Sequence, residues 1–153
     1  MQFTVRSITQ ELADEVRRTR LSPGYGHPAH VEIARGTGPC RCCLQTFAVG
    51  RDARLLFTYR PAGHDGSLMA PGPIFIHAEH CQAYAGPGFP DGLRPLPLAF
   101  EARATGSRVI DLAASRNYSP EAQIEQLFES VGAEWIHLRN AEAGCYIARI
   151  DRA

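Results

Sequence analysis

Lysine is absent from this sequence of 153 residues. All 16 basic residues are arginine, and 16 acidic residues balance them to a formal net charge of zero. The densest group, Arg17, Arg18 and Arg20, falls at the end of a predicted helix, where positive charge complements the helix dipole. Because a nucleic-acid surface needs a positive face or stripe, the composition predicts no nucleic-acid partner.

Long apolar runs are also absent. No stretch approaches the roughly 18 apolar residues of a membrane span, and the N-terminal "MQFTVRSITQ" has no apolar run behind a basic start, as a signal peptide would. These absences predict a cytoplasmic protein with no membrane partner, in a compartment that keeps thiols reduced. Five cysteines, an odd number, fit a disulfide framework poorly.

Several motifs of well-known enzyme classes are missing. The chain has no glycine-rich phosphate loop, no dinucleotide fingerprint, no Gly-x-Ser-x-Gly elbow and no His-Glu-x-x-His motif. The sequence names neither a partner nor an oligomeric state, so function has to be sought in its cysteine and histidine residues.

The length and the pattern of apolar residues predict one domain over residues 1–153. Hydrophobic residues make up 44% of the chain, enough for an ordinary core. Alternation and short apolar runs predict strands at 3–8, 31–35, 52–61, 74–78, 98–105, 108–113, 133–140 and 144–151. Too few helices separate these strands for a parallel sheet. We therefore predict an α+β fold, mostly antiparallel sheet with about two helices packed on it.

The two predicted helices carry terminal signals. In "SITQELADEVRRTR" (7–20), Ser7 and Gln10 fit a capping box. In "SPEAQIEQLFES" (119–130), Ser119 is a natural cap and the following proline suits the first turn. The second helix presents one apolar face at i, i+3, i+4 and i+7, formed by Ile124, Leu127, Phe128 and Val131.

Three of the five cysteines lie in "GPCRCCL" (38–44). Cys40 and Cys43 form a Cys-x-x-Cys pair, a spacing that lets two thiolates reach one zinc ion from a single tight turn. The alternative for both is packing, since free cysteine is among the most buried residue types. For Cys42, we favour packing.

A second group of metal-binding side chains occurs in "IFIHAEHC" (74–81). His77 and Cys81 are four residues apart, and a helical turn after the strand would place them on one face. Together with Cys40 and Cys43 they make four ligands of the structural zinc type, and thiolates with imidazole favour zinc over magnesium or calcium. The alternative is a strand end with exposed histidines.

Two other classes of function stay open. In a thiol-dependent enzyme or redox protein, Cys40 or Cys43 would be the nucleophile, Arg41 would stabilise the thiolate, and His77 or His137 would be the base. In a protein-interaction module, the long loops at 61–73 and 85–97 would form the contact surface.

The C-terminal segment "EWIHLRNAEAGCYIARID" (134–151) offers a ligand-binding alternative. Strand alternation places Trp135, His137 and Arg139 on one face. His137 and Arg139 could bind an anion or a carboxylate, but we favour a solvated sheet face, with Trp135 in the core. Asn140 and Gly144 suit the turn between the two strands.

Four landmarks occur in one order: "PCRCCL" (39–44), "LLFTY" (55–59), "GPIFIH" (72–77) with Cys81, and "HLRNAEAGCYIARIDR" (137–152). In these landmarks the chain resembles the bacterial family catalogued as domain of unknown function 1203, from about residue 30 to the C-terminus. The resemblance implies a small intracellular domain and no established reaction, and Cys42 departs from its pattern. It adds Arg41 and Asn140 to the candidate ligand-binding residues, and it also draws attention to Tyr59 and Cys145.

Overall fold

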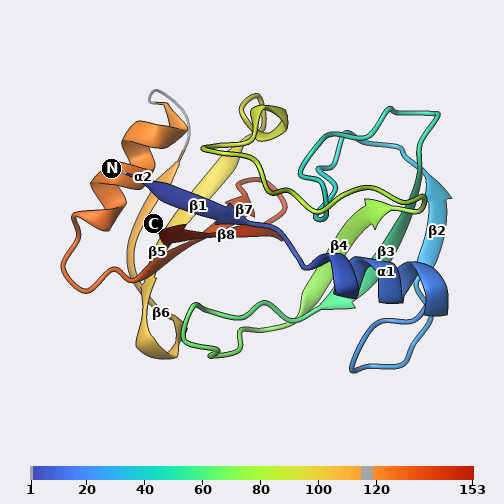
Figure 1. The fold of residues 1–153 in the computed structure, drawn as a ribbon, viewed down its shortest axis with the longest axis horizontal. Coiled ribbons are helices and arrows are strands. Elements are labelled where there is room, and N and C mark those ends of the chain that lie inside the picture. The colour runs from blue at the N-terminus through green and yellow to red at the C-terminus, as the bar shows by residue number, and fades with distance from the viewer. Residues whose placement is uncertain (1, 115–118) are drawn as a thin grey trace.

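The computed structural model describes residues 2–114 and 119–153, which form two antiparallel sheets with one helix beside each (Figure 1). The helices are α1 (Gln10–Thr19) and α2 (Pro120–Phe128). The strands are β1 (Phe3–Arg6), β2 (His30–Ile33), β3 (Ala53–Tyr59), β4 (Gly72–His77), β5 (Leu98–Ala104), β6 (Arg108–Ala114), β7 (Trp135–Asn140) and β8 (Tyr146–Arg152). The predicted α+β class with mostly antiparallel sheet is confirmed.

The larger sheet has the strand order β1-β8-β7-β5-β6 and, together with α2, forms what we call the five-stranded half. Cross-strand pairing places Phe100, Leu138 and Ala148 on one face of the sheet. That face forms a core with Ile124, Leu127 and Phe128 of α2. A short 3-10 turn at Thr105–Ser107 connects β5 and β6 as an antiparallel hairpin, where the predicted strands at 98–105 and 108–113 meet.

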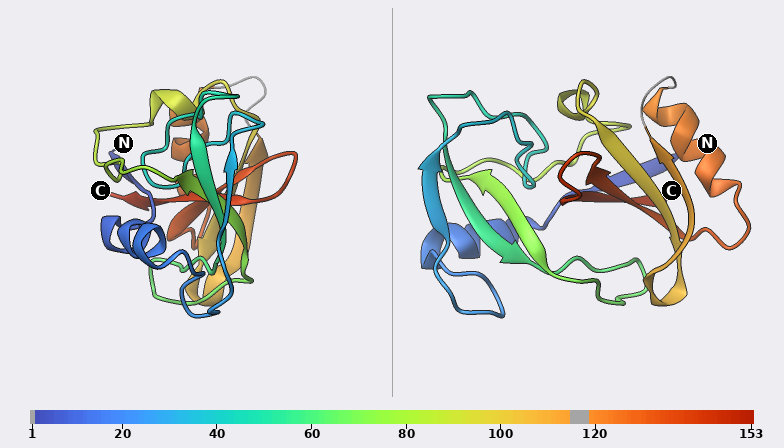
Figure 2. Two further views of the ribbon diagram at one scale, coloured as in Figure 1. Left: turned by 90° about the vertical axis from the view of Figure 1, so that its right-hand side faces the viewer. Right: turned by 180° about the vertical axis from the view of Figure 1, so that it is seen from behind.

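The smaller sheet has the order β2-β3-β4 and, with α1, forms the three-stranded half. Its core joins Ala13 and Val16 of α1 to Leu55 of β3 and Ile76 of β4, and two buried cysteines, Cys40 and Cys42, belong to the same core. The two halves lie at opposite ends of the long axis of the molecule, and the chain between β1 and α1 passes from one to the other (Figures 1 and 2).

The helix termini agree with the predictions in one case and differ in the other. Ser119 caps α2 as predicted, with its hydroxyl accepting from Ala122 N–H at 3.1 Å. At α1 the predicted cap Ser7 is wrong, because Thr9 is the cap and accepts from Leu12 N–H at 3.1 Å. The prediction that Val131 lies on the apolar face of α2 is also wrong. The helix ends at Phe128, and Val131 beyond it is 94% exposed.

The polar face of the five-stranded sheet is covered, which contradicts the predicted solvated face. The segment 60–71 between β3 and β4 packs on it: Arg149 Nη1 donates to Gly63 O at 3.2 Å, and His137 Nε2 lies 3.3 Å from Ala62 O. A Cβ on Gly63 would lie 2.3 Å from Trp135 Cζ2, so glycine is what lets the loop approach so closely. The buried position of Trp135 was predicted correctly.

Within the described ranges, no helix is long and apolar enough to cross a membrane.

Candidate metal centre

A tight turn presents Cys40 and Cys43. Leu44 N–H donates to Cys40 O, and Cys40 N–H donates to Gln45 O, both at 2.9 Å. Leu44 adopts a left-handed conformation with φ 61°, which is uncommon for a residue other than glycine. Gly38 precedes the turn with φ 96°, and a Cβ there would lie 2.5 Å from Phe47 Cδ2. The path into the Cys40–Cys43 turn therefore depends on glycine at 38.

The end of β4 presents the other two side chains. His77 is the last residue of that strand, and the following residues form a bend and extended chain rather than the predicted helical turn. Helix α1 holds this segment from one side, because Arg17 Nε donates to His77 O and Gln10 Nε2 donates to Cys81 O, both at 3.1 Å. These contacts with a distant helix position Cys81 without a helical turn of its own.

The turn and the strand end meet in one group, the Cys3His cluster of Cys40, Cys43, His77 and Cys81. One ligand atom from each residue lies within 4.8 Å of the others. The Sγ atoms of Cys40 and Cys81 are 3.8 Å apart, and Cys43 Sγ is 3.5 Å from His77 Nδ1. The structure thus brings together the four residues that the sequence suggested as ligands.

These two separations match a tetrahedral zinc site. With Zn–S bonds of about 2.3 Å and Zn–N bonds of about 2.0–2.1 Å, tetrahedral angles place two sulfurs about 3.8 Å apart and a sulfur and a nitrogen about 3.5 Å apart. The observed distances are 3.8 and 3.5 Å. Soft thiolates with one imidazole are also the donors that zinc prefers. The cluster can therefore hold a metal ion without rearrangement at these two pairs.

His77 is oriented from its far side. Its Nε2 lies 3.3 Å from Asp52 Oδ2, the same oxygen that accepts from Ala48 N–H at 2.8 Å. The Phe47 ring packs edge-on against the imidazole, with centroids 4.7 Å apart. A proton on Nε2, shared with the carboxylate, leaves the Nδ1 lone pair directed at the cluster. This carboxylate–histidine arrangement is typical of metal-ligating histidines.

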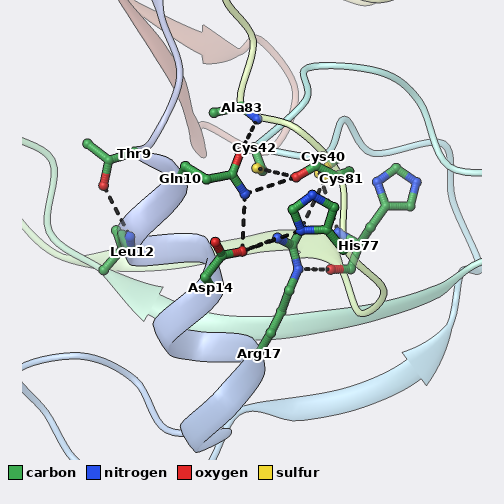
Figure 3. A network of polar contacts seen from close by, with 11 residues as sticks. Thr9, Gln10, Leu12, Asp14, Arg17, Cys40, Cys42, His77, Cys81 and Ala83 are labelled. Atoms are coloured by element: carbon green, nitrogen blue, oxygen red, sulfur yellow. Dashed lines mark hydrogen bonds and ion pairs between the residues drawn. The ribbon is translucent and has the colours of Figure 1, made fainter.

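Helix α1 supplies further polar side chains beside the cluster (Figure 3). Arg17 Nη2 donates to Cys81 Sγ at 3.0 Å, and its Nη1 donates to Asp14 Oδ1 at 3.1 Å. Gln10 spans the helix and the strand end, because its Oε1 also accepts from Ala83 N–H at 2.8 Å. His77 N–H donates to Cys40 Sγ at 3.3 Å. Two of the three ligand sulfurs therefore accept hydrogen bonds from N–H donors, which stabilise thiolates.

The electrostatics of the cluster favour one thiolate and one cation. Hydrogen bonds from the thiols of Cys40, Cys42 and Cys43 lower the pKa of Cys81, and the Arg17 charge adds to this effect. Hydrogen bonds with Cys40 and Cys81, together with burial, raise the pKa of Cys43. Hydrogen bonding to Cys40 raises the pKa of His77 to about 9. The Cys81 thiolate and the His77 cation therefore balance each other within the cluster.

The remaining cysteines and the second histidine of the motif lie outside this group. Cys42 is fully buried, and its Sγ donates weakly to Cys81 O at 3.6 Å, in agreement with the predicted packing role. His80 is not part of the group: its side chain is 66% exposed, and its Nδ1 lies 3.7 Å from Asp14 Oδ1. A cleft of about 330 Å³ opens over the cluster, lined by Cys43, His77 and Cys81 among others. Solvent and ions therefore reach three of the four candidate ligands.

The predicted ligand-binding residues do not come together as one site. Arg41 is buried beside the cluster. Its Nε donates to Tyr146 O at 2.8 Å, its Nη1 donates to Pro39 O at 2.6 Å, and its backbone N–H donates to Phe75 O at 2.9 Å. Asn140 accepts from two N–H groups of the following turn.

The other two predicted ligand-binding residues, His137 and Arg139, lie on the polar face of the five-stranded sheet but differ in exposure to solvent. His137 is 0% exposed, whereas Arg139 lines a cavity between the sheets.

Sequence reasoning missed Asp52 and Arg17. Both act on the cluster across long separations in sequence, 25 residues for Asp52–His77 and 64 for Arg17–Cys81. One local signal exists: Gln10, Asp14 and Arg17 recur at i, i+4 and i+7, the spacing of one helix face. A polar stripe on an otherwise half-buried helix indicates a polar partner beneath it.

The fold and the cluster define a small α+β protein with a Cys3His group that can hold a metal ion. The chain belongs to the family described as Protein of unknown function (DUF1203), whose family model matches residues 37–152. The match includes all four residues of the cluster. No curated protein and no solved structure matches the chain.

Proposed function

We propose that this protein binds one zinc ion through Cys40, Cys43, His77 and Cys81. The observation that carries the proposal is the agreement of two ligand–ligand distances with a zinc tetrahedron, 3.8 Å between sulfurs and 3.5 Å between sulfur and Nδ1. The ion would take the place of protons that otherwise hold the sulfurs in hydrogen bonds with one another. Three sulfurs and one nitrogen complete the coordination of zinc, as in structural sites.

The surrounding charges suit this ion. Three thiolates and one Zn²⁺ carry one net negative charge, and the Arg17 guanidinium lies 3.0 Å from the Cys81 sulfur to offset it. Asp52 holds the proton of His77 on Nε2, so that the imidazole binds as a neutral ligand through Nδ1. Arg17 thus offsets negative charge at Cys81, and Asp52 fixes the tautomer of His77.

The role we infer for the ion is structural. The cluster joins the Cys40–Cys43 turn to the end of β4. Ile8, just before α1, donates its N–H to Arg41 O of the turn, and Arg17 of α1 donates to His77 O. A closed four-ligand site stabilises such a junction without offering an open position for a substrate. Binding free energy gained there is folding free energy for the elements it joins.

Measuring zinc per chain by mass spectrometry, in protein purified without added metal, tests the proposal. We expect one equivalent in the wild type and in Cys145→Ser, whose thiol lies outside the cluster, and loss of zinc in Cys43→Ser. Replacement by Co²⁺ should give the visible absorption of a tetrahedral thiolate site. Less than about a tenth of an equivalent in folded wild-type protein contradicts the proposal.

The thiol-enzyme alternative predicts a different result in the same preparation. A nucleophilic Cys40 or Cys43 would react with iodoacetamide well below the pH at which free cysteine reacts. In the zinc site we expect both thiols to be protected until a chelator removes the ion. Burial argues against Cys40 as a nucleophile, because it is 0% exposed. Cys43 lines the cleft, so the alkylation experiment separates its two roles.

A further inference from the structure

A second site lies where the two halves of the molecule meet, apart from the Cys3His cluster. A cavity of about 210 Å³ opens there. One wall comes from Tyr59 at the end of β3 and from the start of β4, and the other from Arg139 of β7 and the turn into β8. Its lining is Tyr59, Pro61, Ala70, Pro71, Gly72, Pro73, Ile74, Arg139, Ala143, Gly144, Cys145 and Tyr146.

Most of this lining is apolar and rigid. Three prolines and Ile74 form the wall from the three-stranded half. The rings of Tyr59 and Tyr146 pack against each other with centroids 5.7 Å apart. An apolar protein cavity of about 150 Å³ is known to accept benzene. A space of about 210 Å³ therefore has the size for one six-membered ring with a small polar substituent.

The one charged group of the lining is Arg139, and it has donors to spare. Its Nη1 donates to Gly144 O at 3.0 Å, and its Nε pairs with Glu101. Within the described ranges, the acceptor at its Nη2 is the thioether of Met69, at 4.0 Å, which is a weak acceptor. An arginine carries five N–H donors in a planar fork that matches a carboxylate, so hydrogen-bonding capacity at Nη2 is left over.

The charge of Arg139 is also only partly balanced. Glu101, its carboxylate partner, pairs with Arg103 as well. Among the residues that the structure describes, no acidic side chain lines the cavity. A ligand with one negative charge would restore the balance at the mouth of an apolar space.

We propose that this cavity binds a small aromatic carboxylate, with the ring against Tyr59 and Tyr146 and the carboxylate on Arg139. The proposal goes beyond zinc binding and uses none of the cluster residues. It makes Arg139 the residue that selects for charge, and the proline-lined wall the feature that limits the size of the ligand.

Titration of zinc-loaded protein with benzoate tests this inference, with neutral benzamide as the matched probe. Amide resonances in two-dimensional NMR report where each probe binds. We expect saturable shifts at Gly72, Gly144 and Cys145 with benzoate, and affinity for benzamide weaker by about tenfold, the usual worth of a charged hydrogen bond. Shifts at another surface, equal affinity for both probes, or no saturable shift with benzoate overturns the proposal.

Two variants sharpen the test. Arg139→Gln should weaken benzoate by about tenfold and leave benzamide unchanged, while Arg35→Gln, an exposed arginine of the three-stranded half, should change neither. A Cβ on Gly72 would meet no atom within 4 Å beyond its chain neighbours, and the φ of Gly72 lies outside the left-handed region. Gly72→Leu should therefore fill the cavity and abolish binding of both probes in a folded protein. Undiminished benzoate binding in folded Arg139→Gln contradicts the proposal.

Discussion

The five-stranded half and the three-stranded half both consist of an antiparallel sheet with one helix beside it, but their cores differ in composition. The first buries aliphatic and aromatic side chains from four strands and from α2, including Phe100, Ile136 and Leu138. The second has a smaller core, in which Cys40 and Cys42 are fully buried and Cys43 and Cys81 pack at its edge.

The difference follows from the amount of apolar surface that each half can bury. A three-stranded sheet with a ten-residue helix offers little, and small units of this kind commonly need a metal or a disulfide. In the five-stranded half, hydrophobic burial at about 25 cal/mol per Å² suffices. In the three-stranded half, zinc bound at the Cys3His cluster would supply, on our proposal, the cross-link that the core lacks.

We expect the largest effect on the stability of the three-stranded half to follow from the loss of zinc. In Cys43→Ser, or after chelation, we expect the amides of β2, β3 and β4 to lose hydrogen-exchange protection while those of β5 and β7 keep it. The reason is that structural Zn²⁺ binds small domains with about 10–16 kcal/mol of apparent free energy, which becomes folding free energy. Exchange measured by mass spectrometry checks this. Equal loss in both halves would show that the cross-link serves the whole molecule.

A matched pair of core truncations compares the two halves through their apolar cores instead of through zinc. Phe100→Ala in the five-stranded half should lower the free energy of unfolding by about 3–5 kcal/mol, and Leu55→Ala in the three-stranded half by about 2–5 kcal/mol. Only Leu55→Ala should also weaken zinc retention, because its core contains Cys40. Denaturant unfolding together with zinc analysis gives both quantities. Zinc loss in Phe100→Ala would count against two separate cores.

Asp52→Asn tests the outer partner of the cluster. Removing the carboxylate charge that holds the Nε2 proton of His77 should lower zinc affinity by about 10–100-fold, the usual effect of such partners. Competition with a chromophoric chelator measures the affinity. The control is Asp65→Asn, which removes a loop carboxylate that accepts from Ser67 and Gly106 and should leave zinc affinity unchanged. Unaltered affinity in Asp52→Asn would mean that His77 needs no orienting group.

Acid should destabilise the five-stranded half through His137. Burial lowers the pKa of His137 to about 3, so below pH 6.5 the unfolded chain binds a proton that the folded chain refuses. Stability then falls as the pH falls, by about 1.4 kcal/mol per unit between pH 6.5 and 3. The charged groups facing His137 are Glu101 and Arg103 of β5, Arg139 of β7 and Arg149 of β8.

His137→Phe should remove this contribution, making its stability less dependent on pH than that of the wild type. From pH 7 to 5.5 the wild type should lose about 1.3 kcal/mol more stability than the variant, and unfolding in urea at several pH values measures this difference. The acid response of the cluster is common to both proteins and cancels. Parallel curves would show that folding does not change the pKa of His137.

Much of the fold could be predicted from local pattern. Alternation in "LAFEARAT" and the cap and proline of α2 depend on neighbours in sequence, and the structure has β5 and α2 there. The division into two sheets could not be predicted, because periodicity gives no pairing partner. The cover over His137 was missed for the same reason: residues 60–71 carry turn signals, which say nothing of what a loop packs against.

The candidate site divides in the same way. Cys40 with Cys43, and His77 with Cys81, are each close in sequence and have recognisable spacing, so both pairs could be named. That the pairs would meet was only a hypothesis until the structure placed them within 4.8 Å. Asp52 and Arg17 carry no spacing signal relative to the ligands, because only contacts between residues far apart in sequence bring them to the cluster.

Arg41 has a consequence for the junction of the two halves. Burial lowers its pKa to about 10, so it is still a cation at neutral pH, and it is only 4% exposed where it donates to Tyr146 O. Mobile ions screen exposed pairs such as Arg94–Glu121 but do not reach a buried donor. High ionic strength therefore weakens the surface pairs of either half while leaving the bond that joins them intact.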